Sequence, residues 1–358
     1  MSYNGRIMSN DNFSVNRVRE RRVERSLTQA QLADRAGISR TAVTAIEGAN
    51  LVPSVVTALS LAAALECTVE ELFGQLPRKP ELAAWAWEPT TNSNRFWNAE
   101  VFGRTLKYPA AATPMLTSLP DDSTDGLPAA ASAKPSETLV IACCDPAAGL
   151  LASQFQAVTG MRLIVIPRSS IQAIELLRQG LVHLARLHLA TAEHPDRNAD
   201  VVRMELGSEY ELLRLSQWHE GVALANSSRH RSVRSVLSAK LTWIGREEGS
   251  GARQCLDELL QGRRTPRCLA KNHQGVATAI QSGWADAGVC VQLVSEEAGL
   301  RFLPVQEEAY DVCYAKAFSG DRRLKAFINV VRSVAYRRLL SNLPGYDTTT
   351  TGCVAGDK

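Results

Sequence analysis

The sequence of 358 residues is too long for one small domain and long enough for two or three. Apolar residues make up 45% of the chain and charged residues 22%, as in ordinary globular proteins, and a net charge of only +3 excludes a uniformly basic nucleic-acid coat. No apolar window suits a membrane helix or a signal peptide, and the eight cysteines form neither a CxxC pair nor a zinc-type Cys/His spacing. We therefore expect a cytoplasmic protein with reduced cysteines and no membrane partner.

Positive charge is concentrated near the N-terminus, in a predicted helix over residues 15–25. Five arginines, among them Arg17 and Arg22, stand there against two glutamates. Such a run is often a solvated helix face. Because the next stretch predicts a DNA-binding motif, a patch that faces DNA phosphates is the better interpretation.

Residues 28–50 predict two short helices joined by a tight turn. Thr28 can accept a free backbone N–H, and Gln31 three residues later completes a capping box. Gly37 suits the left-handed residue that ends a helix, Ser39 caps a second helix and Gly48 ends it. This arrangement is a helix-turn-helix, although an ordinary helical hairpin is the alternative.

The second helix has an outward face suited to base recognition. The surrounding stretches TQAQLADRAGIS, AIEGAN and LVPSVVTALSLAAALECTVEELF resemble the phage-repressor-type (xenobiotic-response-element) helix-turn-helix domain. The resemblance implies a five-helix all-α domain over residues 12–75 that binds a DNA operator as a homodimer. It further implies a phosphate contact from Gln29, a position near the DNA backbone for Asn50, a structural role for Glu47, and base contacts from Arg40, Thr41 and Thr44.

Residues 81–112 form a predicted short connector that contains β-strands. Its density of tryptophan and phenylalanine fits either a ligand or partner surface, or a small sheet that packs on its neighbours, which we favour. Residues 113–137 are rich in Pro, Ala, Ser, Thr and Asp, which predicts a flexible linker.

From residue 138 the pattern changes to alternating strands and helices, which indicates parallel sheets covered on both faces. Two long extended segments, ELLRLSQWHEGVALA and RFLPVQEEAYDVCYA, connect two such groups and predict two lobes with a cleft between them. The predicted α/β domain covers residues 138–346, and residues 347–358 form a tail.

The same region resembles the type 2 periplasmic-binding-protein fold in CDPAAGLLA, HLARLHL, REEGSGARQCLDELL, NHQGVATAIQSGWADAGV and EEAYDV. The resemblance is strongest to the version fused behind a helix-turn-helix, whose transport relatives include molybdate and tungstate binders. The implied effector is therefore a small oxyanion such as molybdate or tungstate, and no other cofactor is expected. The predicted fold class is thus multidomain: a helix-turn-helix domain, a β-containing connector and a two-lobed α/β domain.

Turns at the carboxyl ends of the strands supply the candidate ligand-binding residues, since helix N-termini there offer free N–H donors. The candidates are Asp145, Ser169, Ser170, His188, Gly249, Ser250, Gly251, Arg253, His273 and Tyr310. The segment GSGARQ lacks the third glycine of a dinucleotide fingerprint, and no P-loop sequence occurs, so a nucleotide is disfavoured. We predict a regulator whose DNA binding responds to a small anion or polar metabolite.

Two alternatives involve cysteine. Cys143 and Cys144 could sense thiol chemistry or a soft metal, although adjacent strand residues diverge and a buried strand end is favoured. An enzyme using Cys144, His188 and Asp145 is disfavoured, because binding folds of this kind rarely need a nucleophile. We expect His188 to reach the cleft and His183 to lie at the surface.

Overall fold

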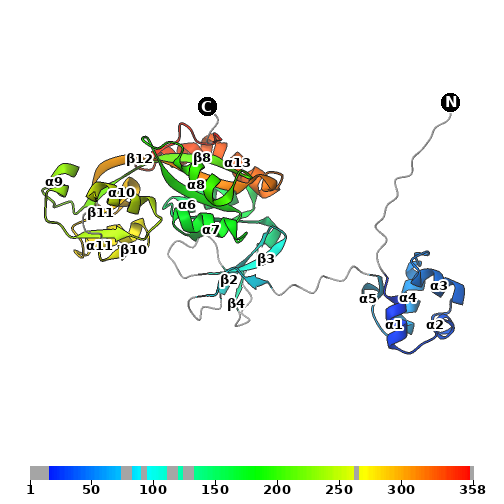
Figure 1. The fold of residues 1–358 in the computed structure, drawn as a ribbon. Coiled ribbons are helices and arrows are strands. Elements are labelled where there is room, and N and C mark those ends of the chain that lie inside the picture. The colour runs from blue at the N-terminus through cyan, green and yellow to red at the C-terminus, as the bar shows by residue number, and fades with distance from the viewer. Residues whose placement is uncertain are drawn as a thin grey trace, which may run out of the picture. The chain divides into compact units, whose positions relative to one another are not determined.

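The structure is a computed structural model that describes residues 16–73, 83–89, 95–110, 120–123, 133–261 and 266–354. The chain divides into two compact units, Met1–Leu82 and Ala83–Lys358 (Figure 1). Within the described segments, no helix has both the length and the apolar character needed to cross a membrane.

The N-terminal unit is built from short helices around a small apolar core. The helices are α1 (Val18–Glu24), α2 (Gln29–Ala36), α3 (Arg40–Glu47), α4 (Val55–Ala64) and α5 (Val69–Phe73). The predicted capping box of α2 is confirmed: the Thr28 hydroxyl accepts from the Gln31 backbone N–H at 3.2 Å, and Gln31 Oε1 accepts from the Thr28 N–H at 2.8 Å. Gly37 has a left-handed φ of 65°, and Ser39 caps α3. These local signals place α3 against α2 as a helix-turn-helix.

The larger unit begins with a four-stranded sheet in the order β1-β3-β2-β4. Its strands are β1 (Ala84–Trp85), β2 (Arg95–Val101), β3 (Arg104–Pro109) and β4 (Asp122–Ser123). Tyr108 donates its hydroxyl to the Leu181 carbonyl at 2.6 Å, and buried Asp121 pairs with Arg162. The connector is therefore part of the larger unit and packs on its neighbours. The predicted linker over 113–137 needs correction at residues 120–123 and 133–137, which are structured; its other residues lie outside the described segments.

The main sheet has nine strands in the order β10-β9-β11-β8-β12-β7-β5-β6, with β13 also paired to β8. The strands are β5 (Thr138–Cys143), β6 (Arg162–Pro167), β7 (Leu184–Thr191), β8 (Tyr210–Leu224), β9 (Trp243–Arg246), β10 (Leu269–Ala270), β11 (Ala287–Val291), β12 (Arg301–Ala315) and β13 (Tyr346–Asp347). The pairs β5–β6, β5–β7, β9–β10 and β9–β11 are parallel, as predicted, whereas β8 and β12 run antiparallel to their neighbours.

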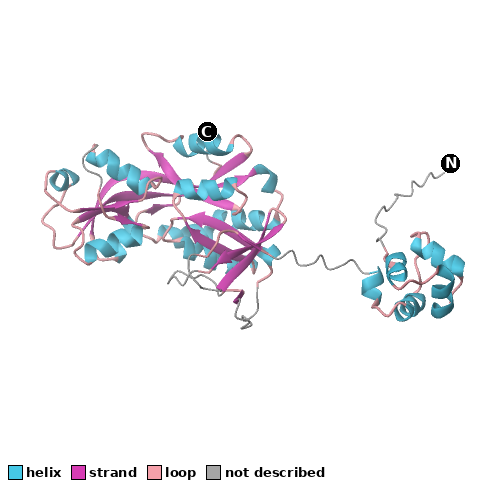
Figure 2. Ribbon diagram, turned by 60° about the horizontal axis from the view of Figure 1, so that its bottom comes forward, coloured by secondary structure: helices cyan, strands magenta, loops and turns pink. Residues whose placement is uncertain are grey.

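Helices cover this sheet on two sides, and Figure 2 shows the strands running between them. They are α6 (Ala148–Thr159), α7 (Ser170–Arg178), α8 (Arg197–Leu206), α9 (Val233–Leu237), α10 (Gly251–Leu260), α11 (His273–Gln281), α12 (Gln292–Glu297), α13 (Arg322–Arg332) and α14 (Val334–Ser341). We call β5–β7 with α6–α8, α13 and α14 the first lobe, and β9–β11 with α9–α12 the second lobe. The long antiparallel pair β8 and β12 passes through both lobes.

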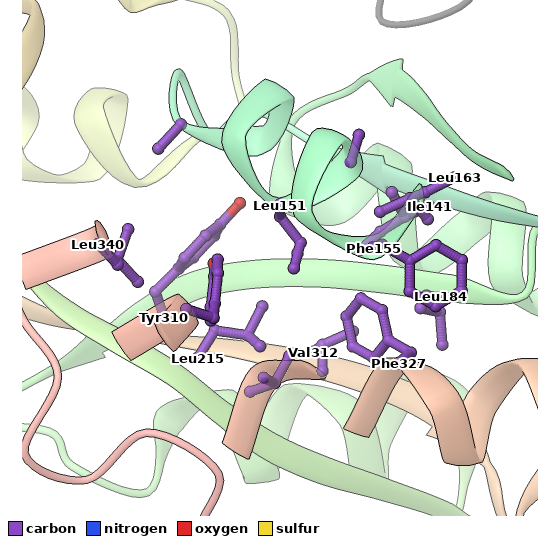
Figure 3. Close-up of a cluster of buried hydrophobic side chains, with 14 of the residues drawn as sticks. Ile141, Leu151, Phe155, Leu163, Leu184, Leu215, Tyr310, Val312, Phe327 and Leu340 are labelled. Atoms are coloured by element: carbon purple, nitrogen blue, oxygen red, sulfur yellow. The ribbon is translucent and has the colours of Figure 1, made fainter. Parts of the chain in front are cut away.

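Strand β5 shows why the first lobe needs cover on two faces. All six of its residues are buried, and alternate residues point to opposite sides. Ile141 joins one core with Phe155 of α6 and Phe327 of α13, whose rings lie 6.4 Å apart (Figure 3). Val140 joins the other core, which includes Tyr108 of the connector sheet. The connector therefore completes the core of the first lobe.

Two stretches differ from the sequence predictions. Helix α8 occupies a segment that the sequence analysis did not assign to a helix; its buried side is formed by Asn198 and Val202. The predicted tail is ordered as far as residue 354, because Thr351 donates its hydroxyl to the Leu215 carbonyl at 2.8 Å and Arg214 donates its backbone N–H to the Cys353 carbonyl at 2.9 Å. In both stretches, hydrogen bonds from buried polar groups help to anchor the backbone.

Candidate functional site

The outward face of α3 carries the residues predicted to read DNA bases. Val43 and Ile46 are buried in the core, whereas Arg40, Thr41 and Thr44 are exposed. Asn50, just beyond the helix, is also exposed. This division leaves a polar, partly cationic surface at the start of α3, as base recognition requires.

Three residues predicted to lie against DNA, Arg17, Arg22 and Gln29, also make hydrogen bonds within the domain. The Arg22 Nε atom lies 2.6 Å from Glu47 Oε1, and the Gln29 amide donates to Glu47 Oε2 at 2.9 Å. Burial raises the pKa of Glu47, but the bonds from Arg22 and Gln29 outweigh it, and the pKa lies below its ordinary value. Arg22 thus holds α3 in place rather than facing solvent, and half-buried Arg17 donates to the Glu71 carbonyl at 3.4 Å.

In the larger unit, the polar residues meet where β8 and β12 pass between the lobes. His188, near the end of β7, is fully buried; its Nδ1 atom lies 2.6 Å from Glu308 Oε2 and its Nε2 atom 3.0 Å from Cys144 Sγ. The second lobe closes on this ring from the other side. A Cβ atom on Gly251 would lie 2.5 Å from His188 Nδ1, so only glycine fits there. The His273 ring, at the start of α11, has its centroid 6.1 Å from that of His188.

The Glu308 carboxylate is fixed by several donors. The Trp218 indole donates to Oε2 at 2.9 Å, and the Gln306 amide donates to Oε1 at 2.8 Å. Burial raises the pKa of Glu308, but the contacts with His188 dominate and hold the pKa at about 2. Burial and the neighbouring Glu308 raise the pKa of Glu220 well above its ordinary value. The cluster therefore contains one ionised carboxylate and one carboxyl group that favours its neutral form.

The protonation states of the two buried histidines differ. Burial lowers the pKa of His188, but Cys144 and Glu308 outweigh it and raise the pKa well above its ordinary value. For His273, burial together with the charges of Arg246 and His188 lowers the pKa well below its ordinary value. Both nitrogens of His273 are buried without a hydrogen-bond partner in the described part of the chain. His273 is therefore a neutral imidazole with a free lone pair.

A second polar group lies beside this cluster, around Arg186 of β7. Arg186 NH2 lies 2.7 Å from Asp145 Oδ2, and its guanidinium stacks 3.9 Å from the centroid of the Tyr310 ring. Asp145 Oδ1 accepts from the Ala147 N–H at 2.8 Å and from the Tyr346 hydroxyl at 2.7 Å. The Asp145 carboxylate is thus fully used inside the protein, which makes it a support for Arg186.

Several buried polar atoms in this group have no partner among the residues that the structure describes. They are Arg186 Nε, Arg186 NH1 and the Tyr310 hydroxyl. The Ser169 hydroxyl, which caps α7 in a capping box with Gln172, has no acceptor for its proton among the same residues. Buried polar groups in native proteins are almost always hydrogen-bonded, so a concentration of exceptions indicates where a ligand supplies the missing partners.

Other predicted ligand-binding residues have local roles. Ser250 is an ordinary N-cap, since its hydroxyl accepts from the Arg253 N–H and donates to the Glu247 carbonyl. Arg253 bonds along its own helix to Asp257 at 2.7 Å. The Ser170 hydroxyl accepts from the His188 N–H at 3.3 Å. Gly249 packs against α7, where an added Cβ would lie 3.1 Å from the Ile171 side chain. These residues shape the junction, and the Ser250 hydroxyl is used within its own turn.

Three further predictions can be compared with the structure. His183 is buried rather than at the surface: it accepts from the Val140 N–H at 3.0 Å, and burial lowers its pKa to about 3. Burial raises the pKa of Cys143 to about 12, so this cysteine is the buried strand end that we favoured. Cys144 and His188 do lie within hydrogen-bond reach, but the carboxylate on His188 is Glu308 and not Asp145.

Sequence reasoning missed Arg186, Trp218, Glu220 and Glu308, which are all buried at the junction. A signal was present in β7, where Arg186 and His188 stand two residues apart in an otherwise apolar strand and so share one face. Charged residues on a buried strand face need partners or a ligand.

The fold and the junction define a two-lobed binding domain that follows a helix-turn-helix domain in one chain. Residues 152–332 match the family model of the PBP superfamily domain, and residues 18–72 match that of the Helix-turn-helix family. The chain belongs to the PBP superfamily, and it carries a DNA-binding helix-turn-helix of the phage-repressor type. A DNA-binding domain and a ligand-binding domain therefore occur together, as in a ligand-responsive regulator.

A curated relative, "Uncharacterized protein YvgK" of Bacillus subtilis (strain 168), is 30% identical over 197 residues. The match covers 52% of this chain and 63% of that protein, so the chain spans less than two thirds of its relative. Among solved structures, the tungstate ABC transporter of Geobacter sulfurreducens has a TM-score of 0.45 at 13% identity, covering 57% of this chain and 98% of that one. An ABC-type phosphate transport receptor of Vibrio cholerae has a TM-score of 0.42 at 13% identity, covering 57% and 97%.

Proposed function

We propose that this protein is a transcription regulator that binds an operator through α3 and changes its DNA affinity when a small polar effector binds between the lobes. The observation that carries the proposal is the set of buried polar atoms without partners at the lobe junction: Arg186 Nε and NH1, and the hydroxyls of Tyr310 and Ser169. A site that offers unused donors from a rigid surrounding is prepared for a ligand. The proposed role is binding rather than catalysis.

The chemistry of the free donors favours an anionic or strongly polar effector. A guanidinium with two free nitrogen donors, Nε and NH1, suits an oxyanion or a carboxylate, and the two hydroxyls add neutral donors. The N-terminus of α7, immediately after Ser169, adds a partial positive charge. Molybdate and tungstate are the first effectors to test, because the sequence resembles their binders; phosphate, sulfate and small carboxylates come next.

An effector can regulate DNA binding only by favouring one arrangement of the lobes over another. The residues around the junction come from both lobes, since His188 belongs to β7, and Gly251 and His273 begin α10 and α11. A ligand that binds there stabilises the closed arrangement by the difference between its affinities for the closed and open forms. We propose that this closure changes how the helix-turn-helix domains are presented to DNA.

We also propose that the regulator acts as a homodimer. Helix-turn-helix proteins of this kind bind paired half-sites about one turn of DNA apart. The N-terminal unit exposes apolar side chains at the start of α4, where Val52, Val55 and Val56 are 73%, 77% and 74% exposed. Beside them lies a groove of about 300 Å³, lined partly by Leu51 and Phe73. An apolar surface of this kind suits contact with a second copy of the chain. Mass photometry of the full-length protein tests this, since a particle of monomer mass only would refute the dimer.

The regulatory proposal is tested in two steps on the full-length protein. Duplexes are first selected from a random DNA pool, and a thermal-shift screen then identifies effectors. An effector present at about 100 times its Kd should stabilise the protein by about 2.7 kcal/mol and should change the affinity for the selected duplex. An effector that stabilises the protein without changing DNA affinity would disprove the coupling.

Two conservative variants test the location of the effector. Tyr310→Phe removes a hydroxyl that has no partner among the described residues, so we expect little loss of stability in the free protein. Ser169→Ala also removes the N-cap of α7, so we expect it to cost about 0.5 to 2 kcal/mol of stability. Each should weaken effector binding by about 5- to 10-fold, the effect of one lost hydrogen bond of about 1 to 1.5 kcal/mol. Tyr108→Phe is the matched control, because that hydroxyl bonds Leu181 away from the junction. Unchanged effector affinity in both variants would place the effector elsewhere.

A further inference from the structure

Three potential metal ligands converge at the lobe junction. One ligand atom from each of Cys144, His188 and His273 lies within 4.8 Å of the others. The His188 atom on this side is Nε2, which is 3.0 Å from Cys144 Sγ. A tetrahedral Zn²⁺ ion bound to one thiolate and one imidazole holds the sulfur and nitrogen about 3.5 Å apart. Cys144 Sγ and His188 Nε2 would therefore need to separate by only about half an ångström to accept the ion between them.

The other nitrogen of His188 is held in the way that metal-binding histidines are held. A metal-bound imidazole usually donates its second N–H to a carboxylate, which fixes the ring and its tautomer. His188 Nδ1 lies 2.6 Å from Glu308 Oε2, and Trp218 and Gln306 donate to the same carboxylate. The ring is thus oriented so that Nε2 faces Cys144 and is available as a ligand.

His273 supplies a second, independent observation. The residue is only 1% exposed, yet neither of its ring nitrogens has a hydrogen-bond partner within the described segments. An imidazole buried in this way loses its bonds to water and gains none from the protein. Coordination of a metal ion by one of the two nitrogens would compensate for that loss.

We propose that Cys144, His188 and His273 form a binding site for a thiophilic transition-metal ion of the Zn²⁺ class. Binding releases to solvent every proton held between Cys144 Sγ and His188 Nε2, so that the ion meets a thiolate and a neutral imidazole whose remaining N–H, on Nδ1, donates to Glu308. Three protein ligands leave a fourth position for water or for a donor atom of another molecule. His188, Glu220 and Glu308 also lie within 4.8 Å of one another, but a metal there would have to break the bond between His188 and Glu308.

The site would act as a clamp between the lobes. Cys144 and His188 belong to the first lobe, and His273 begins α11 of the second lobe. A metal ion that binds all three residues stabilises the closed arrangement. The affinity for the ion falls when the lobes separate, because His273 then no longer reaches it. That the clamp controls DNA binding rests on the proposed function, whereas the existence of the metal site does not.

Metal binding is tested with reduced, chelator-treated full-length protein. Co²⁺ is titrated first, because thiolate-to-cobalt absorption reports a sulfur ligand, and Zn²⁺ is then added to displace it. We expect saturation at about one equivalent per chain, loss of the thiolate band in Cys144→Ser, and an affinity at least about 10-fold lower in His273→Asn. Glu308→Gln, which alters the support of His188, should lower affinity by about 10- to 100-fold.

Matched controls use exposed residues of the same types in the same unit. Cys353→Ser and His194→Asn should bind Co²⁺ as the unsubstituted protein does. Circular dichroism melting of every metal-free variant identifies any that fails to fold; if Cys144→Ser does, the His273→Asn titration decides. Absence of saturation, or a thiolate band that survives in Cys144→Ser, would overturn the proposal.

The outcome separates the metal site from the regulatory proposal. Metal binding without any change in affinity for a selected duplex would leave the site intact and remove its regulatory role. No metal binding, together with a DNA response to another effector, would remove the metal site and leave the proposed function standing.

Discussion

The contact between Gly251 and His188 makes the closed junction sensitive to a single methyl group. In Gly251→Ala the new Cβ would lie 2.5 Å from His188 Nδ1 and 2.6 Å from the His188 carbonyl oxygen, where ordinary van der Waals contact begins at 3.4 Å. His188 cannot retreat easily, because its Nδ1 atom is bonded to Glu308. The clash can therefore be relieved by about 1 Å of movement between the lobes.

The expected size of this effect follows from the energetics of overpacking. An extra methyl group forced into a packed site costs about 1 to 3 kcal/mol. Separation of the lobes removes this penalty, so the closed form should lose population relative to the open form by about 5- to 150-fold. Each lobe keeps its own core, so global stability should change far less.

Hydrogen–deuterium exchange measures this shift without an effector. Residues 247–254 pack against the first lobe, where the Gly249 carbonyl accepts from the Ile171 N–H at 3.5 Å, so peptides from this segment and from residues 168–174 should exchange faster in Gly251→Ala. Gly320→Ala is the matched control, because a Cβ there has no neighbour within 4 Å. Exchange in these peptides equal to that of the control would refute the inference that Gly251 governs closure.

Three further predictions concern the DNA-binding unit and pH. Glu47→Gln should destabilise the N-terminal unit by about 1.5 to 3 kcal/mol, because Arg22 loses a charged partner. Since the pKa of Glu47 is lowered in the folded state, the contribution of Glu47 to stability is present above the ordinary carboxyl pKa and is lost on acidification. Urea unfolding at several pH values measures both effects. Arg40→Ala should weaken binding to a selected duplex by about 1 to 3 kcal/mol in gel shifts while leaving the melting temperature unchanged, and an unaffected affinity would contradict its role in base recognition. Because burial holds the pKa of His183 at about 3, its contribution to stability is complete above pH 6.5 and falls as the pH drops from 6.5 toward 3; His183→Gln should flatten that dependence, and an identical pH profile would count against it.

The sequence predicted best what local chemistry determines. Thr28, Gln31 and Gly37 act on backbone groups within a few residues, so the ends of α2 could be read directly from the chain. The strands and helices of the larger unit were also visible, because buried parallel strands are continuous apolar runs. Helix α8 was missed because polar residues dominate its start, and its Asn198 amide is buried by bonding to Asp311 and to the Ala309 carbonyl.

The candidate site was harder to predict, because its residues meet across long stretches of sequence. His188 and Glu308 are separated by 120 positions, and Arg22 and Glu47 by 25. A residue type alone does not reveal such a partner: Arg22 looked like a phosphate contact, and its ion pair with Glu47 became evident only in the folded domain. Likewise, Ser250 and Ser169 both cap helices, yet of these two only Ser169 has no acceptor for its hydroxyl proton in the described structure.

His188 connects the two proposed sites at the junction. Its backbone N–H bonds Ser170, next to the free Ser169 hydroxyl, while its ring contacts Cys144 and Glu308. A metal ion held by Cys144, His188 and His273 joins both lobes, whereas the free donors near Arg186 lie on β7, on β12 and just before α7. The proposed closure by an anion therefore requires that the anion also contacts the second lobe. Two ligands that favour one state raise each other's affinity by equal factors. If both sites are real, each ligand must tighten the binding of the other, and independent binding would show that at least one of them does not act through closure.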